Sequence, residues 1–278
     1  MNDPIYPFSN RPLITWDIEY ASLTLFECDI NKLRPFVPEE LKLLEVRPGV
    51  GVFSISLFKY YPWQQGIYEE VYETIFNIHV QPSLKWGVPT VSLFVVSFGS
   101  NDAQFLEDEL KHNLFPTYKN TLNFDLDAEN YVARCYDADG PVYEIRNPSH
   151  KKPIFTKQYI YAQVYVRHEG KVYRSHNTFR GLAYQHQENG ATGVIYNHPF
   201  FLGSDVAGVN PPSYLQMLTM PHSDLRQIYY WRPELIDGSL PYEPPVDVKN
   251  LTPEQRELLR LITYADNIQR PFRVPIPC

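Results

Sequence analysis

The sequence predicts an α+β protein, mainly antiparallel β, in which a closed or partly closed barrel surrounds a central cavity and a few helices lie at the periphery. Three observations predict this class. Apolar and polar residues alternate along most of the chain, as they do in strands with one buried face. The pair Asp139–Gly140 separates two such runs, which is typical of a β-hairpin. Stretches with helix-capping signals are few.

Strands are expected over residues 14–28, 51–58, 66–76 and 89–98, and hairpins over 135–145 and 158–180. In the first strand the apolar parity changes, which predicts a bulge near Ala21–Ser22. In the second, GVFSISLF, the apolar residues share one face, so Ser54 and Ser56 lie on the other. The run PTVSLFVVSF is apolar almost throughout, which indicates a strand buried on both faces.

Four helices are expected. Asp29 can cap a short helix over Ile30–Leu33, and Ser100, Asn101 or Asp102 can cap the helix that follows. A third is expected over 212–220, and a fourth begins at Thr252 with a capping box. Residues 241–248 form an extended, proline-rich linker before this last helix. We therefore expect a single domain over residues 1–278, with 241–278 as its C-terminal linker and helix.

Composition narrows the class of partner. The 278 residues are 44% hydrophobic, which is enough for a large core, and the net charge is -7. No basic stripe occurs, so nucleic acid is not expected as a partner. No run of about 18 apolar residues occurs, so no membrane partner is expected either. The first residues lack an apolar signal core and the three cysteines form no disulfide framework, which predicts a cytoplasmic protein.

Known motifs for metals and organic cofactors are missing from the sequence. The eight histidines show no HExxH or similar spacing, and the cysteine spacing fits no zinc site. No GxSxG elbow, P-loop or GxGxxG followed by a suitable acid occurs. We therefore expect no metal and no cofactor.

The segment GIYEEVYETIF holds the first candidate for chemistry. On a strand, Glu70 shares a face with Tyr68 and Tyr72, while Glu69 and Glu73 lie on the opposite face. A carboxylate enclosed with tyrosines can have a raised pKa and act as a general acid or base. The alternative is a solvated strand end with ordinary surface acids.

The segment KVYRSHNTFR is the second candidate. Arg174, His176, Thr178 and Arg180 share one face of the expected strand, and the other face is also polar. Such a strand can line a wet cavity, where two arginines and a histidine would orient an anionic or carbonyl substrate. The alternative is an edge strand protected by charge.

The segment NLFPTYKNTLNF holds the third candidate, Lys119. Leu114 to Tyr118, which precede it, carry no charge. A lysine with apolar neighbours can lose its proton near neutral pH and act as a nucleophile. It can equally point to solvent from the first turn of a helix.

Several segments, taken in order over residues 17–146, resemble the acetoacetate decarboxylase superfamily. They are EYASLTLFECD running into INKLRPFVPEEL, then GVFSISLF, then IYEEVYETIFNIHV with its pair Tyr68 and Glu70, and then ELKHNLFPTYK. The resemblance implies an antiparallel closed barrel with a cone-shaped cavity, and a homo-oligomer. In the decarboxylases a lysine forms a Schiff base with a β-keto acid, and a neighbouring lysine lowers its pKa.

The chain departs from that family's pattern at most catalytic positions. Thr117 and Tyr118 stand where the resemblance places the two lysines, and Ser54 stands near the first glutamate position. The arginine position aligns near Glu19, so only Glu70 of the set is kept. Lys119 lies two residues beyond the nucleophile's place, which on a helical turn rotates the side chain by about 200°.

These observations predict a cofactor-independent enzyme that acts by acid–base chemistry on a small β-keto or enol compound. A lyase, dehydratase, cyclase or isomerase of specialised metabolism fits. The expected catalytic residues are Glu70, Lys119, Tyr118 and His176, and the expected substrate-binding residues are Tyr68, Tyr72, Arg174, Arg180, Thr117 and Ser54. Two alternatives stay open: a Schiff-base decarboxylase that uses Lys119, and a barrel that binds a small molecule without turning it over.

Overall fold

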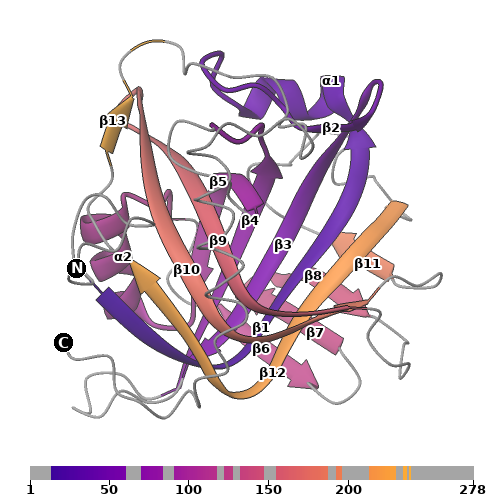
Figure 1. Cartoon of the computed structure of the whole chain (residues 1–278). Coiled ribbons are helices and arrows are strands. Elements are labelled where there is room, and N and C mark those ends of the chain that lie inside the picture. Colours follow the sequence, from indigo (N-terminus) through magenta and orange to yellow (C-terminus); the bar gives the residue numbers. More distant parts are fainter. Residues whose placement is uncertain are drawn as a thin grey trace.

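Two β-sheets account for most of the residues that the structure describes (Figure 1). The computed structural model describes residues 14–60, 70–83, 91–117, 122–127, 132–146, 155–186, 192–195, 213–229, 234–236 and 238. The large sheet has nine strands: β1 (Ile14–Asp29), β2 (Glu45–Arg47), β3 (Val50–Tyr60), β4 (Val71–His79), β5 (Val91–Ser100), β9 (Phe155–His168), β10 (Lys171–His186), β12 (Ser213–Tyr229) and β13 (Glu234–Ile236). The small sheet has four: β6 (Asn123–Asp127), β7 (Val132–Asp137), β8 (Gly140–Arg146) and β11 (Thr192–Ile195).

The large sheet is antiparallel except between β5 and β9, which run parallel. Its strands follow the order β1-β12-β10-β9-β5-β4-β3-β2, with β13 beside β10. β1 pairs with β12 on one side and with β3 on the other, so the sheet wraps around (Figure 1). A mainly antiparallel β protein with few helices is therefore confirmed, whereas the expected closure of the sheet into a barrel is not.

The first strand forms as expected, but its irregularity lies earlier than the sequence suggested. The pairing of β1 with β3 shifts between Ile18 and Tyr20, not near Ala21–Ser22. As a result, Ile18 and Ala21 lie in one hydrophobic cluster, while Tyr20 packs with Leu57 in another. The bulge thus sends Tyr20 to the face opposite Ile18.

Two of the expected helices are confirmed with their caps. The backbone N–H of Asn31 donates to Asp29 Oδ1 over 2.8 Å at the start of α1 (Ile30–Leu33), which runs into a 3-10 turn over Arg34–Phe36. The N–H of Phe105 donates to Asp102 Oδ1 over 2.7 Å at the start of α2 (Ala103–Asn113). No helix in the described part of the chain is long and apolar enough to cross a membrane.

The helix expected over 212–220 is wrong, because this segment begins the long strand β12. Residues such as Leu215 and Met217 favour helices in isolation, but β12 pairs with β1 on one side and β10 on the other. Backbone pairing on both sides outweighs local propensity here. The linker and helix expected over 241–278 lie outside the described residues.

The two faces of the large sheet bury different clusters. One face, here called the inner face, gathers apolar side chains from β1, β3, β4, β5 and β9, such as Leu23, Val52, Ile75, Val95 and Val164. Helix α2 adds Phe105 and Leu106 to this cluster. These side chains form one hydrophobic cluster on this face of the sheet.

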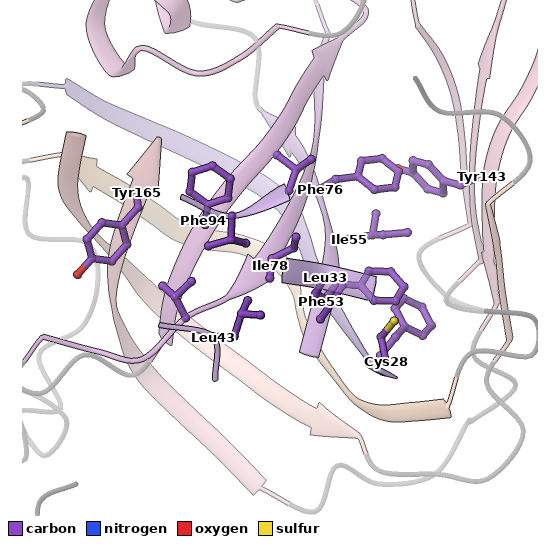
Figure 2. Packing of buried hydrophobic residues seen from close by; sticks show 14 of the residues in the cluster. Cys28, Leu33, Leu43, Phe53, Ile55, Phe76, Ile78, Phe94, Tyr143 and Tyr165 are labelled. Carbon is purple, nitrogen blue, oxygen red and sulfur yellow. The ribbon is translucent and has the colours of Figure 1, made fainter. Parts of the chain in front are cut away.

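The opposite, outer face is covered by α1 and the small sheet. Figure 2 shows this packing, in which Phe76 of β4 and Tyr143 of β8 point toward each other. Their ring centroids lie 5.7 Å apart in an edge-to-face arrangement. Phe53 and Ile55 belong to this outer cluster, so Ser54 and Ser56 lie on the inner face, which confirms the predicted alternation.

Candidate acid–base site

The inner face carries polar side chains on two neighbouring strands, β3 and β4. Their register places Ser54 opposite Asn77 and Phe58 opposite Glu73. Side chains alternate along each strand, so Ser54, Asn77 and Glu73 share the inner face with apolar residues such as Ile75. Polar groups in such a place need hydrogen-bond partners, and these partners define two groups.

The first group is centred on the carboxyl of Glu73, whose side chain is buried. The Tyr60 hydroxyl donates a hydrogen bond to Glu73 Oε2 over 2.5 Å. Within the described part of the chain, the other oxygen, Oε1, has no hydrogen-bond partner. Tyr60 packs against Phe105 of α2 with ring centroids 5.4 Å apart, so the pair lies under the helix.

Helix α2 brings a second buried acid, Glu109, to the same place. The Asn113 side-chain amide donates to Glu109 Oε2 over 2.5 Å. Phe105, Glu109 and Asn113 are spaced by four residues and are all buried, so they form the face of α2 that meets the sheet. Two carboxyl groups therefore lie close together in the core.

This environment changes the protonation of Glu73. Burial raises the pKa of the Glu73 carboxyl well above its usual range, and the like charge of neighbouring Glu109 raises it further. The hydrogen bond from Tyr60 acts in the opposite direction, because it favours the charged form. A carboxyl with a raised pKa can give and take a proton near neutral pH, as a general acid or base requires.

The second group joins β3 and β4 further along the same face. His79 Nε2 and Ser54 Oγ lie 3.1 Å apart, within hydrogen-bond distance. The Asn77 side-chain amide donates to Ser56 Oγ over 3.0 Å. All four side chains are buried. Burial lowers the pKa of His79 to about 4, so its imidazole is neutral at neutral pH.

Glu70 does not lie where the sequence hypothesis needs it. Its side chain is 55% exposed, and Glu70 Oε1 forms an ion pair of 2.7 Å with Lys59 Nζ. Lys59 also pairs with Glu19 over 3.1 Å. The predicted parity is right, since Lys59 lies opposite Tyr72 and over its ring, on the face away from Glu73. Glu70 thus belongs to a partly solvated ion-pair cluster, whereas the enclosed carboxyl is Glu73.

The predicted face of β10 is described only in part. Arg174 is buried and lies opposite Tyr165, which belongs to the outer cluster. Tyr173 packs against the inner cluster instead, so Arg174 is on the face away from Glu73. β10 is also no edge strand, because it pairs with β9 and β12. The backbones of His176 and Arg180 lie in β10, but the side chains of these two residues are not among those that the structure describes.

The segment with the expected lysine starts beside the inner face. The Phe98 N–H of β5 donates to the Pro116 carbonyl over 2.8 Å, and Phe115 packs on Phe98 in the inner cluster. Thr117 forms an isolated parallel bridge with Phe98 and is exposed. Tyr118, Lys119 and Tyr68 lie outside the described residues.

Sequence reasoning missed Tyr60, Glu73, Glu109 and His79 as site residues. One signal was available, because Glu109 follows Phe105 by four residues, so a helix with Phe105 buried also buries Glu109. No corresponding signal linked His79 to Ser54, since their contact depends on the register of β3 and β4. Among the described residues, no group of three or more histidine, cysteine or acidic side chains could hold a metal ion.

Comparison with solved structures identifies the fold. The chain is similar to an acetoacetate decarboxylase with a TM-score of 0.57 and 11% identity, covering 86% of this chain and 99% of that one. An acetoacetate decarboxylase from Legionella pneumophila gives 0.57 and 10%, covering 82% and 88%. The enduracididine biosynthesis enzyme MppR, complexed with pyruvate, gives 0.57 and 9%, covering 82% and 92%.

The chain therefore has the acetoacetate decarboxylase-like fold, as the sequence resemblance predicted. No family model matches the sequence, and no curated protein matches it either. At identities of 9–11%, the likeness is one of fold. The assignment of function accordingly depends on the residues of this chain.

Proposed function

We propose that this protein is an enzyme that acts by acid–base chemistry on a small carbonyl compound, a β-keto acid or an enol, with Glu73 as the group that transfers the proton. The reaction class is that of a lyase, dehydratase, cyclase or isomerase. The observation that carries the proposal is the buried Glu73 carboxyl, which accepts a hydrogen bond from the Tyr60 hydroxyl and whose pKa is raised by burial and by neighbouring Glu109.

The chemistry follows from the two forms of this carboxyl. As a carboxylate, Glu73 takes a proton from the carbon next to a carbonyl group, so that an enol or enolate forms. As a carboxylic acid it returns the proton, either to that carbon or to a leaving oxygen. A raised pKa makes the protonated form of Glu73 more available than that of an ordinary glutamate, so the carboxyl can serve as an acid as well as a base. Tyr60 holds one carboxyl oxygen, and the other, which is buried, has no hydrogen-bond partner among the described residues, so this second oxygen is the one assigned to proton transfer.

Solved structures of this fold guide the choice of first substrates. One similar protein, MppR, is described as complexed with pyruvate, and again with the condensation product of pyruvate and imidazole 4-carboxaldehyde. Two others are acetoacetate decarboxylases. Pyruvate and acetoacetate are therefore the first probes to try on this chain.

The proposal is tested by exchange of carbon-bound protons. The wild-type protein is incubated in D₂O with pyruvate or acetoacetate, and loss of the methyl or methylene proton signals is followed by NMR. We expect catalysed exchange, and a rate lower by about 100-fold or more in Glu73→Gln. Glu70→Gln, which alters the exposed acid three residues away, should keep the wild-type rate. A Glu73→Gln rate equal to wild type, or a loss confined to Glu70→Gln, would overturn the assignment.

A second candidate is the Schiff-base decarboxylase that uses Lys119. It is favoured by Phe115, four residues earlier, which is buried in the inner cluster beside Phe98. Borohydride reduction in the presence of acetoacetate, followed by mass spectrometry, tests this route. An adduct on Lys119 that is lost in Lys119→Met would support the imine. Turnover without any adduct would exclude it.

The third candidate is a barrel that binds a small molecule without turnover. It is favoured by the pairing of most inner polar groups with one another, as in Ser56 and Asn77. Calorimetric binding of pyruvate or acetoacetate, with no proton exchange and no decarboxylation, would support this reading over both enzymatic ones.

A further inference from the structure

The Ser54–His79 pair lies on the same face as Glu73 but well separated from it. Asn77 and His79 follow Glu73 by four and six residues along β4. At about 3.3 Å per residue, these positions lie roughly 13 and 20 Å from Glu73 along the strand. The two groups are therefore distinct places on one inner face.

The pair stands in apolar surroundings. Val52, two residues before Ser54 on β3, and Val95, which lies opposite Asn77, belong to the inner hydrophobic cluster. Ser54 is 0% and His79 4% exposed. Burying a hydroxyl or an imidazole costs free energy unless hydrogen bonds replace those made to water. Leucine or valine at these positions would avoid that cost, so packing alone does not explain the choice of residues.

The hydrogen-bonding capacity of the pair exceeds what it uses. A serine hydroxyl can donate one bond and accept two, and a neutral imidazole can donate one and accept one. Among the residues that the structure describes, Ser54 and His79 make a single side-chain hydrogen bond, which joins them to each other. The other ring nitrogen, Nδ1, and the remaining capacity of the hydroxyl are directed at no described partner.

We propose that Ser54 and His79 form a binding subsite for an uncharged oxygen, a carbonyl or a hydroxyl group, of the molecule that this protein binds. The proposal rests on the proposed function in one respect: a molecule that reaches both this subsite and Glu73 is a carbonyl compound with a second, uncharged oxygen function. Such a molecule spans roughly 13 to 20 Å along the sheet, so it is larger than a three-carbon acid.

The chemistry of the subsite favours a neutral group over an anion. Ser54, Ser56 and Asn77 carry no charge, and burial keeps the His79 imidazole neutral. A carboxylate that moved from water to this group would lose its hydration and would meet no positively charged partner. Such a transfer is strongly unfavourable. A carbonyl or hydroxyl oxygen needs only hydrogen bonds, which a hydroxyl and an imidazole supply.

The test uses hydroxyacetone as a neutral probe and pyruvate as its anionic counterpart. The imidazole nitrogen resonances of His79 are followed by NMR in the full-length protein, with assignment by His79→Gln. We expect hydroxyacetone to shift these resonances saturably and pyruvate to leave them unchanged. Ser54→Ala should weaken hydroxyacetone binding by about fivefold or more, the effect of losing one hydrogen bond. Ser54→Cys, which keeps the volume, should weaken it similarly if the alanine variant does not fold.

Ser22→Ala is the matched control, because Ser22 is also buried but lies between Ala21 and Leu23 on the opposite face of β1. It should bind hydroxyacetone as wild type does. Absence of a saturable shift in His79, or equal binding by the Ser54 and Ser22 variants, would overturn the subsite. Glu73→Gln separates the two proposals, since it should lower the rate of proton exchange by about 100-fold or more yet keep the hydroxyacetone shift. Exchange at the wild-type rate in Glu73→Gln, while the shift persists, would refute the proposed function alone.

Discussion

The Tyr60 hydroxyl donates a hydrogen bond to Glu73 across the β3–β4 pair, although these residues are not directly opposite each other. Tyr60 lies opposite Val71, and Glu73 lies opposite Phe58, so the contact is diagonal. Diagonal neighbours on one sheet face are within reach of a long aromatic side chain. This contact fixes one oxygen of the carboxyl on which the account depends.

Removal of the Tyr60 hydroxyl should raise the pKa of Glu73 further. The hydrogen bond favours the charged carboxylate and so lowers the pKa of Glu73, whereas burial raises it. Tyr60→Phe removes the lowering effect. We also expect a loss of about 1–3 kcal/mol in the free energy of unfolding, because a buried acceptor loses its donor. Carbon NMR titration of labelled glutamate and urea unfolding measure the two effects. Tyr173→Phe, which changes another tyrosine beside the inner cluster, is the control and should leave the Glu73 titration unchanged.

Neutralisation of Glu109 should lower the pKa of Glu73. Glu109→Gln removes the like charge, which is the second cause of the raised value after burial. The pKa should stay above the usual range, since burial persists. Glu107→Gln, on the exposed side of the same helix, is the matched control. Equal titration of Glu73 in both variants would contradict the acid pair.

The raised pKa of Glu73 makes the stability of the folded protein depend on pH. The folded state holds this proton more tightly than the unfolded state, so stability falls as pH rises from the ordinary value of 4.5 toward the raised one. Glu73→Gln removes the contribution, because glutamine does not titrate. The stability of this variant relative to wild type should therefore be greater at pH 8 than at pH 5. Urea unfolding at both pH values checks this, and a difference that does not depend on pH would argue against it.

His79 should contribute the opposite dependence in acid. Its pKa falls from 6.5 to about 4 on folding because the charged imidazole is poorly solvated in the core. The unfolded state then binds more protons between these values, so stability is lost as pH falls from 6.5 to 4. The difference between the two pKa values of His79 corresponds to roughly 3 kcal/mol in the free energy of unfolding. His79→Gln should flatten this part of the stability curve, and an unchanged slope between pH 6.5 and 4 would contradict the assignment.

The sequence predicted the alternation of strands more accurately than it predicted the site. Because side chains alternate along a strand, Ser54 is predicted to lie on the face opposite Phe53, and Glu70 on the face opposite Glu73. Both predictions are confirmed. The parity alone did not say which face is enclosed. Of the two alternatives for Glu70, an enclosed carboxylate beside tyrosines or a solvated surface acid, the structure favours the second, since Glu70 meets Lys59 and is 55% exposed.

The remaining site residues depend on contacts between distant segments. Glu109 meets Glu73 because α2 packs on the inner cluster, and His79 meets Ser54 because β3 and β4 pair in one register. A single sequence does not encode either relationship locally. The prediction of a helix over 212–220 is wrong for the same reason, since the two strands that pair with β12 are distant in the chain.

The proposed acid–base chemistry depends on a raised pKa of the buried Glu73 carboxyl, so that its protonated form can be detected at neutral pH. Infrared difference spectroscopy of wild type minus Glu73→Gln at pH 7 tests it most directly. We expect the C=O stretch of a protonated carboxylic acid in the wild-type protein, sensitive to deuterium exchange and missing from the variant. A spectrum at pH 7 that shows only a carboxylate band lost on substitution would contradict the account.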